Sequence, residues 1–185
     1  LASSAASDVY KRQVQGPVDY TPGAYRNATR EGFRIDYRNP MSQGTRAHQV
    51  AAYVVFDAPL VMLCDSPTRY MADEACTRFI ASLPVVFDTT RVLAGEIGEY
   101  IVTARKRQDC WYVGGLTGWT PRTLDVDLSL LDPGREYTAT LLADDGRSAA
   151  EPARYVLSTQ RVTSATRLQI PVSYTHLTLP TKLEV

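Results

Sequence analysis

The sequence predicts an α+β chain in which a helix–strand–helix unit, the closing part of an α/β barrel or of a doubly wound sheet, is followed by an antiparallel β-sandwich. Residues 60–64 are apolar at every position and lie between two helical patterns, which is typical of a parallel strand buried on both faces. After residue 84, apolar and polar residues alternate in six or seven short segments separated by turn signals. Such alternation indicates antiparallel strands with one buried and one exposed face.

Both ends of the chain are set apart from this pattern. Residues 3–13 and 172–181 show neither the helical nor the strand period. One DNA sequence explains both, because the codons of the first segment, read as the reverse complement in a shifted frame, encode the second. That DNA resembles a transposon-end adapter of sequencing libraries. We therefore predict that residues 1–13 and 172–185 are adapter-derived rather than native, and we exclude them from the fold.

Residues 14–83 are assigned to this helix–strand–helix unit. Residues 16–39 contain Pro, Gly and Asn among polar residues, which predicts a long loop, and such a loop in a compact domain is usually functional. A helix is predicted over residues 45–57, with Thr45 as its N-cap. A second helix is predicted over residues 70–83. Its apolar side consists of Ala72, Ala75, Cys76, Phe79, Ile80 and Leu83.

Residues 84–171 are assigned to the β-sandwich. A hairpin is predicted from two strands around residues 100–103 and 110–113, joined by a polar turn at residues 105–109. The glycines that follow, Gly114, Gly115 and Gly118, are interpreted as another turn. The clearest alternation places three residues in the core, Leu124, Val126 and Leu128, and three in water, Asp125, Asp127 and Ser129.

Composition excludes several classes of function. The 20 Lys and Arg residues balance the 20 Asp and Glu residues without a basic block, so neither nucleic acid nor a membrane surface is predicted as a partner. Three cysteines without a CxxC pair predict neither a zinc site nor a disulfide framework. We expect Cys64 and Cys76 to be buried and inert.

Several stretches of sequence resemble the C-terminal portion of glycoside hydrolase family 97, which contains α-glucosidases and α-galactosidases. They are GPVDYTPGAY, NPMSQGTRAHQVAAYVVFDAPLVMLCDSP, VVFDTTRVLAGEIGEYIVTARK and CWYVGGLTGWTPRTLDVDLSLL. The resemblance implies that residues 14–83 are the last helix–strand–helix part, the C-terminal part, of a catalytic (β/α)8 barrel. It also implies that the intact parent is an α-glycosidase that hydrolyses α-glycosidic bonds in oligosaccharides. It also implies a periplasmic or secreted protein whose C-terminal sandwich contacts other copies in a homo-oligomer.

The resemblance implies that the catalytic groups lie upstream of the DYTPG block. There the family has its general acid and base, the nucleophile of its retaining branch and the ligands of the calcium ion of its glucosidase branch. No catalytic residue and no metal ligand is therefore predicted within this chain, and calcium is expected only in the intact parent. The chain alone is predicted to be inactive.

Three residues are predicted to contact the substrate, namely Asp19, Tyr20 and Asp65. Each carboxylate ends a predicted barrel strand, and active sites of such barrels lie at the C-terminal ends of the strands. The alternatives stay open, since Asp65 also suits a turn in the Asp-Ser-Pro corner and Asp19 with Tyr20 also suits loop packing. His48 either reaches the substrate or bonds a loop backbone, and the second is favoured.

A second function, of another class, is a non-catalytic carbohydrate-binding or oligomerisation module formed by the sandwich alone. Trp111, Tyr112 and Trp119 are the aromatic residues that could stack on sugar rings. Trp111 shares a face with Val113 and is therefore expected in the core, and Trp119 is expected to pack against the barrel.

Overall fold

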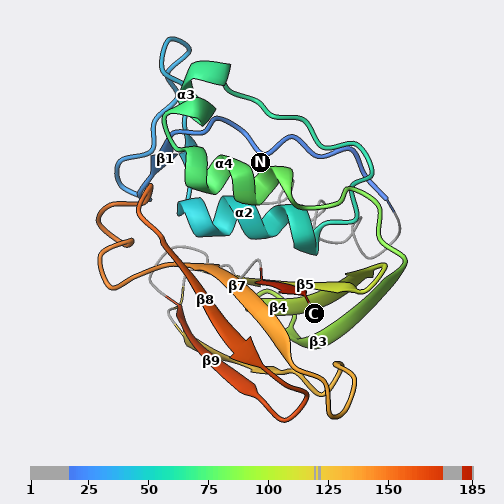
Figure 1. Cartoon of the computed structure of the whole chain (residues 1–185). Coiled ribbons are helices and arrows are strands. Elements are labelled where there is room, and N and C mark those ends of the chain that lie inside the picture. The colour runs from blue at the N-terminus through green and yellow to red at the C-terminus, as the bar shows by residue number, and fades with distance from the viewer. Residues whose placement is uncertain (1–16, 119, 121, 173–180, 185) are drawn as a thin grey trace.

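A computed structural model describes residues 17–118, 120, 122–172 and 181–184. Three layers are stacked in it, as Figure 1 shows. A helical layer covers one face of a six-stranded sheet, and a two-stranded sheet covers the other face. The long loop at the N-terminal side carries a small parallel pair, β1 (Asn27–Ala28) with β2 (Ser42–Gln43).

Helix α2 (Arg46–Val55) confirms the first predicted helix. Its N-cap is Thr45, whose side-chain oxygen accepts the backbone N–H of His48 at 3.1 Å. Seven of its ten residues are buried, because the helix lies against the six-stranded sheet on one side and the other helices on the other. The helix therefore belongs to the core of the whole molecule.

The second predicted helix is wrong as a single element. Residues 67–81 form two helices, α3 (Pro67–Met71) and α4 (Glu74–Ala81), that are separated at Asp73. The carboxylate of Asp73 accepts the backbone N–H of Cys76 at 3.4 Å and so begins a new helix. As a consequence Ala72 and Ala75 are exposed, although Cys76 and Phe79 are buried as predicted.

The predicted parallel strand is present only as a single bridge between Tyr20 and Val61. The backbone N–H of Tyr20 donates to Leu60 O at 3.1 Å, and that of Met62 donates to Tyr20 O at 3.3 Å. The direction is parallel, as predicted, but the segment is not buried on both faces, since the exposed fractions of Leu60, Met62 and Leu63 are 53%, 48% and 55%. The described residues do not form a barrel by themselves, so the barrel stays a prediction.

The second half of the chain consists of antiparallel strands, as predicted. The large sheet has the order β3-β4-β5-β10-β7-β8 and the small sheet pairs β6 with β9. Their bounds are β3 (Thr89–Glu96), β4 (Tyr100–Arg107), β5 (Cys110–Thr117), β6 (Arg122–Asp127), β7 (Tyr137–Ala143), β8 (Val156–Val162), β9 (Arg167–Val172) and β10 (Thr181–Glu184).

The predicted alternation in residues 124–129 is confirmed, because the three apolar residues of that segment are buried and the polar residues between them are exposed. The core between the two sheets includes Trp111, as expected, with Val102, Val113, Leu168, Ile170 and Leu183. Trp119 lies outside the described residues.

Two expectations about the β4–β5 hairpin are wrong. The strands are longer than predicted, so Arg105 lies within β4 and only Gln108 and Asp109 form the turn. The glycines Gly114 and Gly115 are not a turn but lie inside β5. Both errors arise because polar residues and glycines were interpreted locally, although Arg105 and Gly114 contact α2 and its C-terminal end, and Gly115 lies against Leu124 on the opposite face of the sheet.

Strand β10 lies in the segment that is predicted to be adapter-derived. It pairs antiparallel with β5 on one side and β7 on the other, and Leu183 is completely buried. The origin of these residues stays a prediction. None of the helices among the described residues has both the length and the apolar character needed to cross a membrane.

Candidate functional site

The two predicted strand ends lie side by side. The ring of Tyr20 makes edge contacts with Phe56 and Tyr53, with ring centroids 4.7 and 6.2 Å apart, so it points toward α2. Since neighbouring side chains of an extended segment point to opposite faces, Asp19 points away from the helices, and it is exposed. Asp19 and Tyr20 thus have different surroundings, one open to solvent and one packed.

Asp65 joins the two loops that follow these strand ends. Its Oδ2 accepts the backbone N–H of Tyr25 at 2.8 Å, and its Oδ1 accepts the backbone N–H of Ser66 at 2.7 Å. Arg69 lies 3.9 Å from the same carboxylate, whose side chain is only 12% exposed. This geometry matches the turn alternative, because both oxygens already accept a backbone hydrogen bond.

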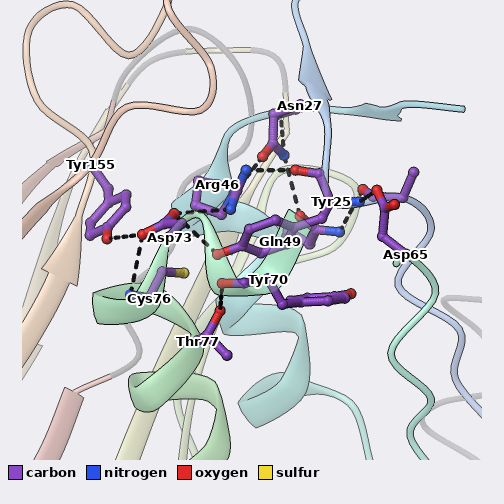
Figure 2. Close-up of polar contacts among 12 residues, drawn as sticks. Tyr25, Asn27, Arg46, Gln49, Asp65, Tyr70, Asp73, Cys76, Thr77 and Tyr155 are labelled. Atoms are coloured by element: carbon purple, nitrogen blue, oxygen red, sulfur yellow. Dashed lines mark hydrogen bonds and ion pairs between the residues drawn. The ribbon is translucent and has the colours of Figure 1, made fainter. Parts of the chain in front are cut away.

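A buried arginine, Arg46, organises the residues around this loop (Figure 2). Its Nε donates to Asn27 Oδ1 at 2.6 Å and its Nη2 donates to the backbone oxygen of Tyr25 at 2.5 Å. Its Nη1 forms an ion pair with Asp73 at 3.1 Å, and the guanidinium lies 3.3 Å from the centre of the Tyr25 ring. The Arg46 side chain is only 5% exposed, so these contacts replace the water that its charge would otherwise need.

Asp73 connects this arginine to the second half of the molecule. It accepts the hydroxyl of Tyr155 at 2.6 Å and the hydroxyl of Tyr25 at 3.1 Å. Tyr155 immediately precedes β8, so a continuous set of hydrogen bonds runs from the sandwich through Asp73 and Tyr25 to Asp65 (Figure 2). We call Tyr25, Arg46, Asp73 and Tyr155 the interdomain hub.

Burial sets the protonation of the hub. Desolvation raises the pKa of Tyr25 above its usual range, and it does the same to the pKa of Tyr155, to which the hydrogen bond with the Asp73 carboxylate adds. Burial also raises the pKa of the Cys76 thiol to about 11. The hydroxyls of Tyr25 and Tyr155 therefore stay protonated near neutral pH and donate hydrogen bonds to the Asp73 carboxylate.

A cleft of about 590 Å³ opens beside the hub, between the loop, α3 and the sandwich. It is lined by Tyr25, Arg26, Asn27, Arg46, Ser66, Thr68, Arg69, Ala72, Asp73 and Ala153. Among the described residues that line it, Asp73 is the only carboxylate, and glycoside cleavage needs two carboxyl groups that flank the bond. The cleft can bind polar groups, but it holds no acid–base pair.

Neither Asp19 nor Asp65 lines this cleft. Among the residues that the structure describes, no three His, Cys, Asp or Glu side chains are grouped so that they could hold a metal ion. The cysteines are free, and Cys64 is half-buried rather than buried as expected.

The comparisons with known proteins agree with this architecture. Residues 86–175 match the family model described as glycosyl-hydrolase 97 C-terminal, oligomerisation. A retaining α-galactosidase of Bacteroides thetaiotaomicron is 53% identical over 133 residues, which are 72% of this chain and 20% of that protein. A probable retaining α-galactosidase of Streptomyces bingchenggensis is 31% identical over 121 residues, which are 65% of this chain and 18% of that protein.

A solved glycoside hydrolase family 97 enzyme in complex with acarbose, from Pseudoalteromonas sp. strain K8, has the same fold. The TM-score is 0.80 at 28% identity, over 94% of this chain and 27% of that one. Fold and matches together define the C-terminal region of a glycoside hydrolase. The chain is similar to the C-terminal region of glycoside hydrolase family 97, and residues 86–175 match the C-terminal domain of that family. The chain spans about a fifth of the length of the curated relatives it matches.

Proposed function

We propose that this chain is the C-terminal part of a retaining α-galactosidase that acts on α-galactosides in oligosaccharides. Residues 14–83 complete its (β/α)8 barrel, and residues 84–171 form a sandwich through which copies associate. The observation that carries this proposal is the 53% identity with the retaining α-galactosidase of Bacteroides thetaiotaomicron, because it extends over 72% of the chain.

The exposed apolar side of residues 60–63 supports the barrel. Residues 20 and 61 already form a parallel bridge, while Leu60, Met62 and Leu63 are about half exposed. Large apolar side chains grouped in this way mark a surface that another element covers. In the proposed parent this element is the rest of the barrel.

Asp19 is the residue that we propose as an acceptor of substrate hydroxyl groups. It is exposed, it lies at a strand end and it points away from α2, as a residue that lines a barrel pocket would. Tyr20 supports it from the helix side, and Asp65 holds the neighbouring loop in place. The catalytic carboxylates, and calcium if the parent uses it, belong to the upstream part. A periplasmic or secreted location stays a prediction.

A chimera tests the proposal. Residues 14–171 would replace the matching region of the Bacteroides thetaiotaomicron α-galactosidase, and turnover of nitrophenyl α-galactoside would be measured. We expect an active chimera, and we expect Asp19→Asn to reduce kcat/KM by about ten- to a hundredfold because one substrate hydrogen bond is lost. A chimera that cleaves only the α-glucoside would contradict the proposed substrate. Turnover by this chain alone would contradict the upstream position of the catalytic groups.

A second function is favoured by one observation, namely that the matching family model is described as an oligomerisation domain. In that case the sandwich acts as an interaction module, with or without affinity for sugars. Calorimetric titration of the full chain with malto-oligosaccharides separates the two forms of this alternative. Heat of binding would identify a carbohydrate-binding module, and its absence would leave the association of copies.

A further inference from the structure

The two outer strands of the six-stranded sheet differ in how far they are protected. Strand β3 has a bulge between Val92 and Ala94 and carries Arg91 and Glu96, features that discourage pairing with another strand. Strand β8 pairs with β7 along all seven of its residues without a bulge. It contains neither glycine nor proline, and Arg161 is its single charged residue. Among the described residues, the outer side of β8 is therefore an unprotected sheet edge.

The side chains of β8 are also open to solvent. Six of its seven residues are exposed, and only Val162 is buried in the core. The exposed fractions of Val156 and Leu157 are 44% and 42%. A bulge-free strand with a single charged residue and exposed branched residues is well suited to accept another strand.

The strand is held in place from the side of the helices. Tyr155, the residue directly before β8, donates its hydroxyl to Asp73 of the interdomain hub at 2.6 Å. A strand that is fixed in this way loses little conformational freedom when it binds, and this favours association.

We infer that β8 pairs antiparallel with β8 of a second copy of this chain, so that two six-stranded sheets become continuous. This inference rests on the association of copies proposed above and names the surface that carries it. When all seven residues pair, the two-fold axis passes through Thr159, which then faces Thr159 of the second copy. In this register Arg161 faces Leu157, so no like charges are opposed.

A second copy fits this edge better than an unrelated strand does, because the same pattern satisfies both sides of a two-fold interface. Pairing at the two-fold axis brings Val156 of one copy beside Val162 of the other, and the polar residues Ser158 and Gln160 beside each other. In these two kinds of pair, branched residues meet branched residues and hydrogen-bonding residues meet hydrogen-bonding residues, which is the arrangement that stabilises cross-strand pairs.

A charge-swap experiment tests the inference on the full chain. Sedimentation equilibrium at concentrations up to roughly 100 µM should show a dimer of the unchanged chain. Thr159→Lys and Thr159→Glu should each weaken the dimer by about tenfold or more, because like charges would be directly opposed at the two-fold axis. A mixture of the two variants should recover a heterodimer. Val92→Lys, at a position 65% exposed on β3, is the matched control and should leave the dimer intact.

Crosslinking gives an independent readout that does not depend on charge. Thr159→Cys should form a reducible dimer, since the two thiols meet at the two-fold axis, and Val92→Cys should not. A wild-type chain that stays monomeric would overturn both the association of copies and the surface. A wild-type dimer that neither charge variant weakens would overturn the β8 surface alone, and the proposed association would then use another face.

Discussion

Arg46 and Asp73 are 27 residues apart in sequence, and each would be costly to bury without the other. Arg46 lies in the first turn of α2, where a positive charge is disfavoured by the helix dipole, and its side chain is almost completely buried. Its contacts with Asn27, Tyr25 and Asp73 compensate for both effects. The loop that carries Asn27 is thereby fixed to two helices.

Removal of the Asp73 charge should be strongly destabilising. Asp73→Asn leaves the Arg46 guanidinium buried without its counter-charge, so we expect the free energy of unfolding to fall by about 2–4 kcal/mol. Urea unfolding followed by circular dichroism measures this change. The matched control is Glu74→Gln, which removes an ion pair with Arg78 whose side chains are 70% and 79% exposed. It should cost no more than about 0.5 kcal/mol, and equal effects of the two variants would refute the role of burial.

The cysteines should differ in reactivity. Cys76 is completely buried and burial raises its thiol pKa to about 11, whereas Cys64 and Cys110 are half-buried. Because the thiolate is the reactive form, Cys76 should remain unmodified in the folded chain at pH 8 while the other two react with an aromatic disulfide reagent. Mass spectrometry of the labelled peptides identifies them. Labelling of Cys76 before unfolding would show that the α4 region opens readily.

At the scale of elements, the packing of α2 against β5 depends on one glycine. A Cβ at Gly114 would lie 2.8 Å from Val55 Cγ2 and 3.0 Å from Val54 Cβ, closer than atoms can approach without a shift. Arg105 from the adjacent strand β4 completes the contact, because it donates to Phe56 O at 2.7 Å and pairs with Asp57 at 2.6 Å at the C-terminal end of the helix. Helix and sheet thus meet closely over the C-terminal half of α2.

Gly114→Ala should therefore push α2 away from the sheet. We expect a loss of about 1–3 kcal/mol in unfolding free energy, as is usual when a packed core receives an extra carbon. The matched control is Gly146→Ala, since a Cβ at Gly146 meets nothing within 4 Å. Thermal unfolding of the two variants, compared with the unchanged chain, provides the measurement. A neutral Gly114→Ala would mean that the helix does not rest on β5 in solution.

The β4–β5 turn should be sensitive to acid. The backbone N–H of Gln108 and the guanidinium of Arg107 bind the Asp88 carboxylate, each at 2.7 Å, and hold its pKa below the usual 3.8. A pKa that is lower in the folded state gives stability that is present above the unfolded pKa and is lost as pH falls through the folded pKa. Asp88→Asn should be less stable than the unchanged chain at pH 7 and equally stable at pH 2, as measured by urea unfolding. A constant difference at all pH values would contradict this.

Sequence patterns predicted those elements whose signals are local. Thr45 as an N-cap and the alternation around Leu124 require only neighbouring residues, and both are confirmed. The hub could not be found in this way, because Tyr25, Asp73 and Tyr155 come from three distant segments. Its single local signal was Asp73, whose position three residues before Cys76 suits an N-cap. The glycines of β5 were misinterpreted because the contacts that require them are tertiary, namely the approach of α2 to Gly114 and of Leu124 to Gly115.

At the scale of the whole molecule, the open apolar side of residues 60–63 should control solubility. Leu60→Gln with Met62→Gln should reduce binding of a hydrophobic dye and aggregation, with little loss of stability because both side chains are already half exposed. Val54→Gln, at a completely buried position, is the contrasting variant and should be destabilising by several kcal/mol. Unchanged dye binding in the double variant would mean that these residues are covered in solution.

The packing of helix α2 also determines at which residue the chain can be cut to obtain a stable C-terminal piece. A division at residue 84 follows the change from helical to alternating sequence patterns. It would, however, remove the helix that packs against Gly114 of β5 and would leave Arg105 without Phe56 and Asp57. The face of the six-stranded sheet that α2 covers would then be exposed to water. An excised piece that begins at residue 45 would keep this face covered by α2. Expression of the association module alone should therefore start at residue 45 rather than at residue 84.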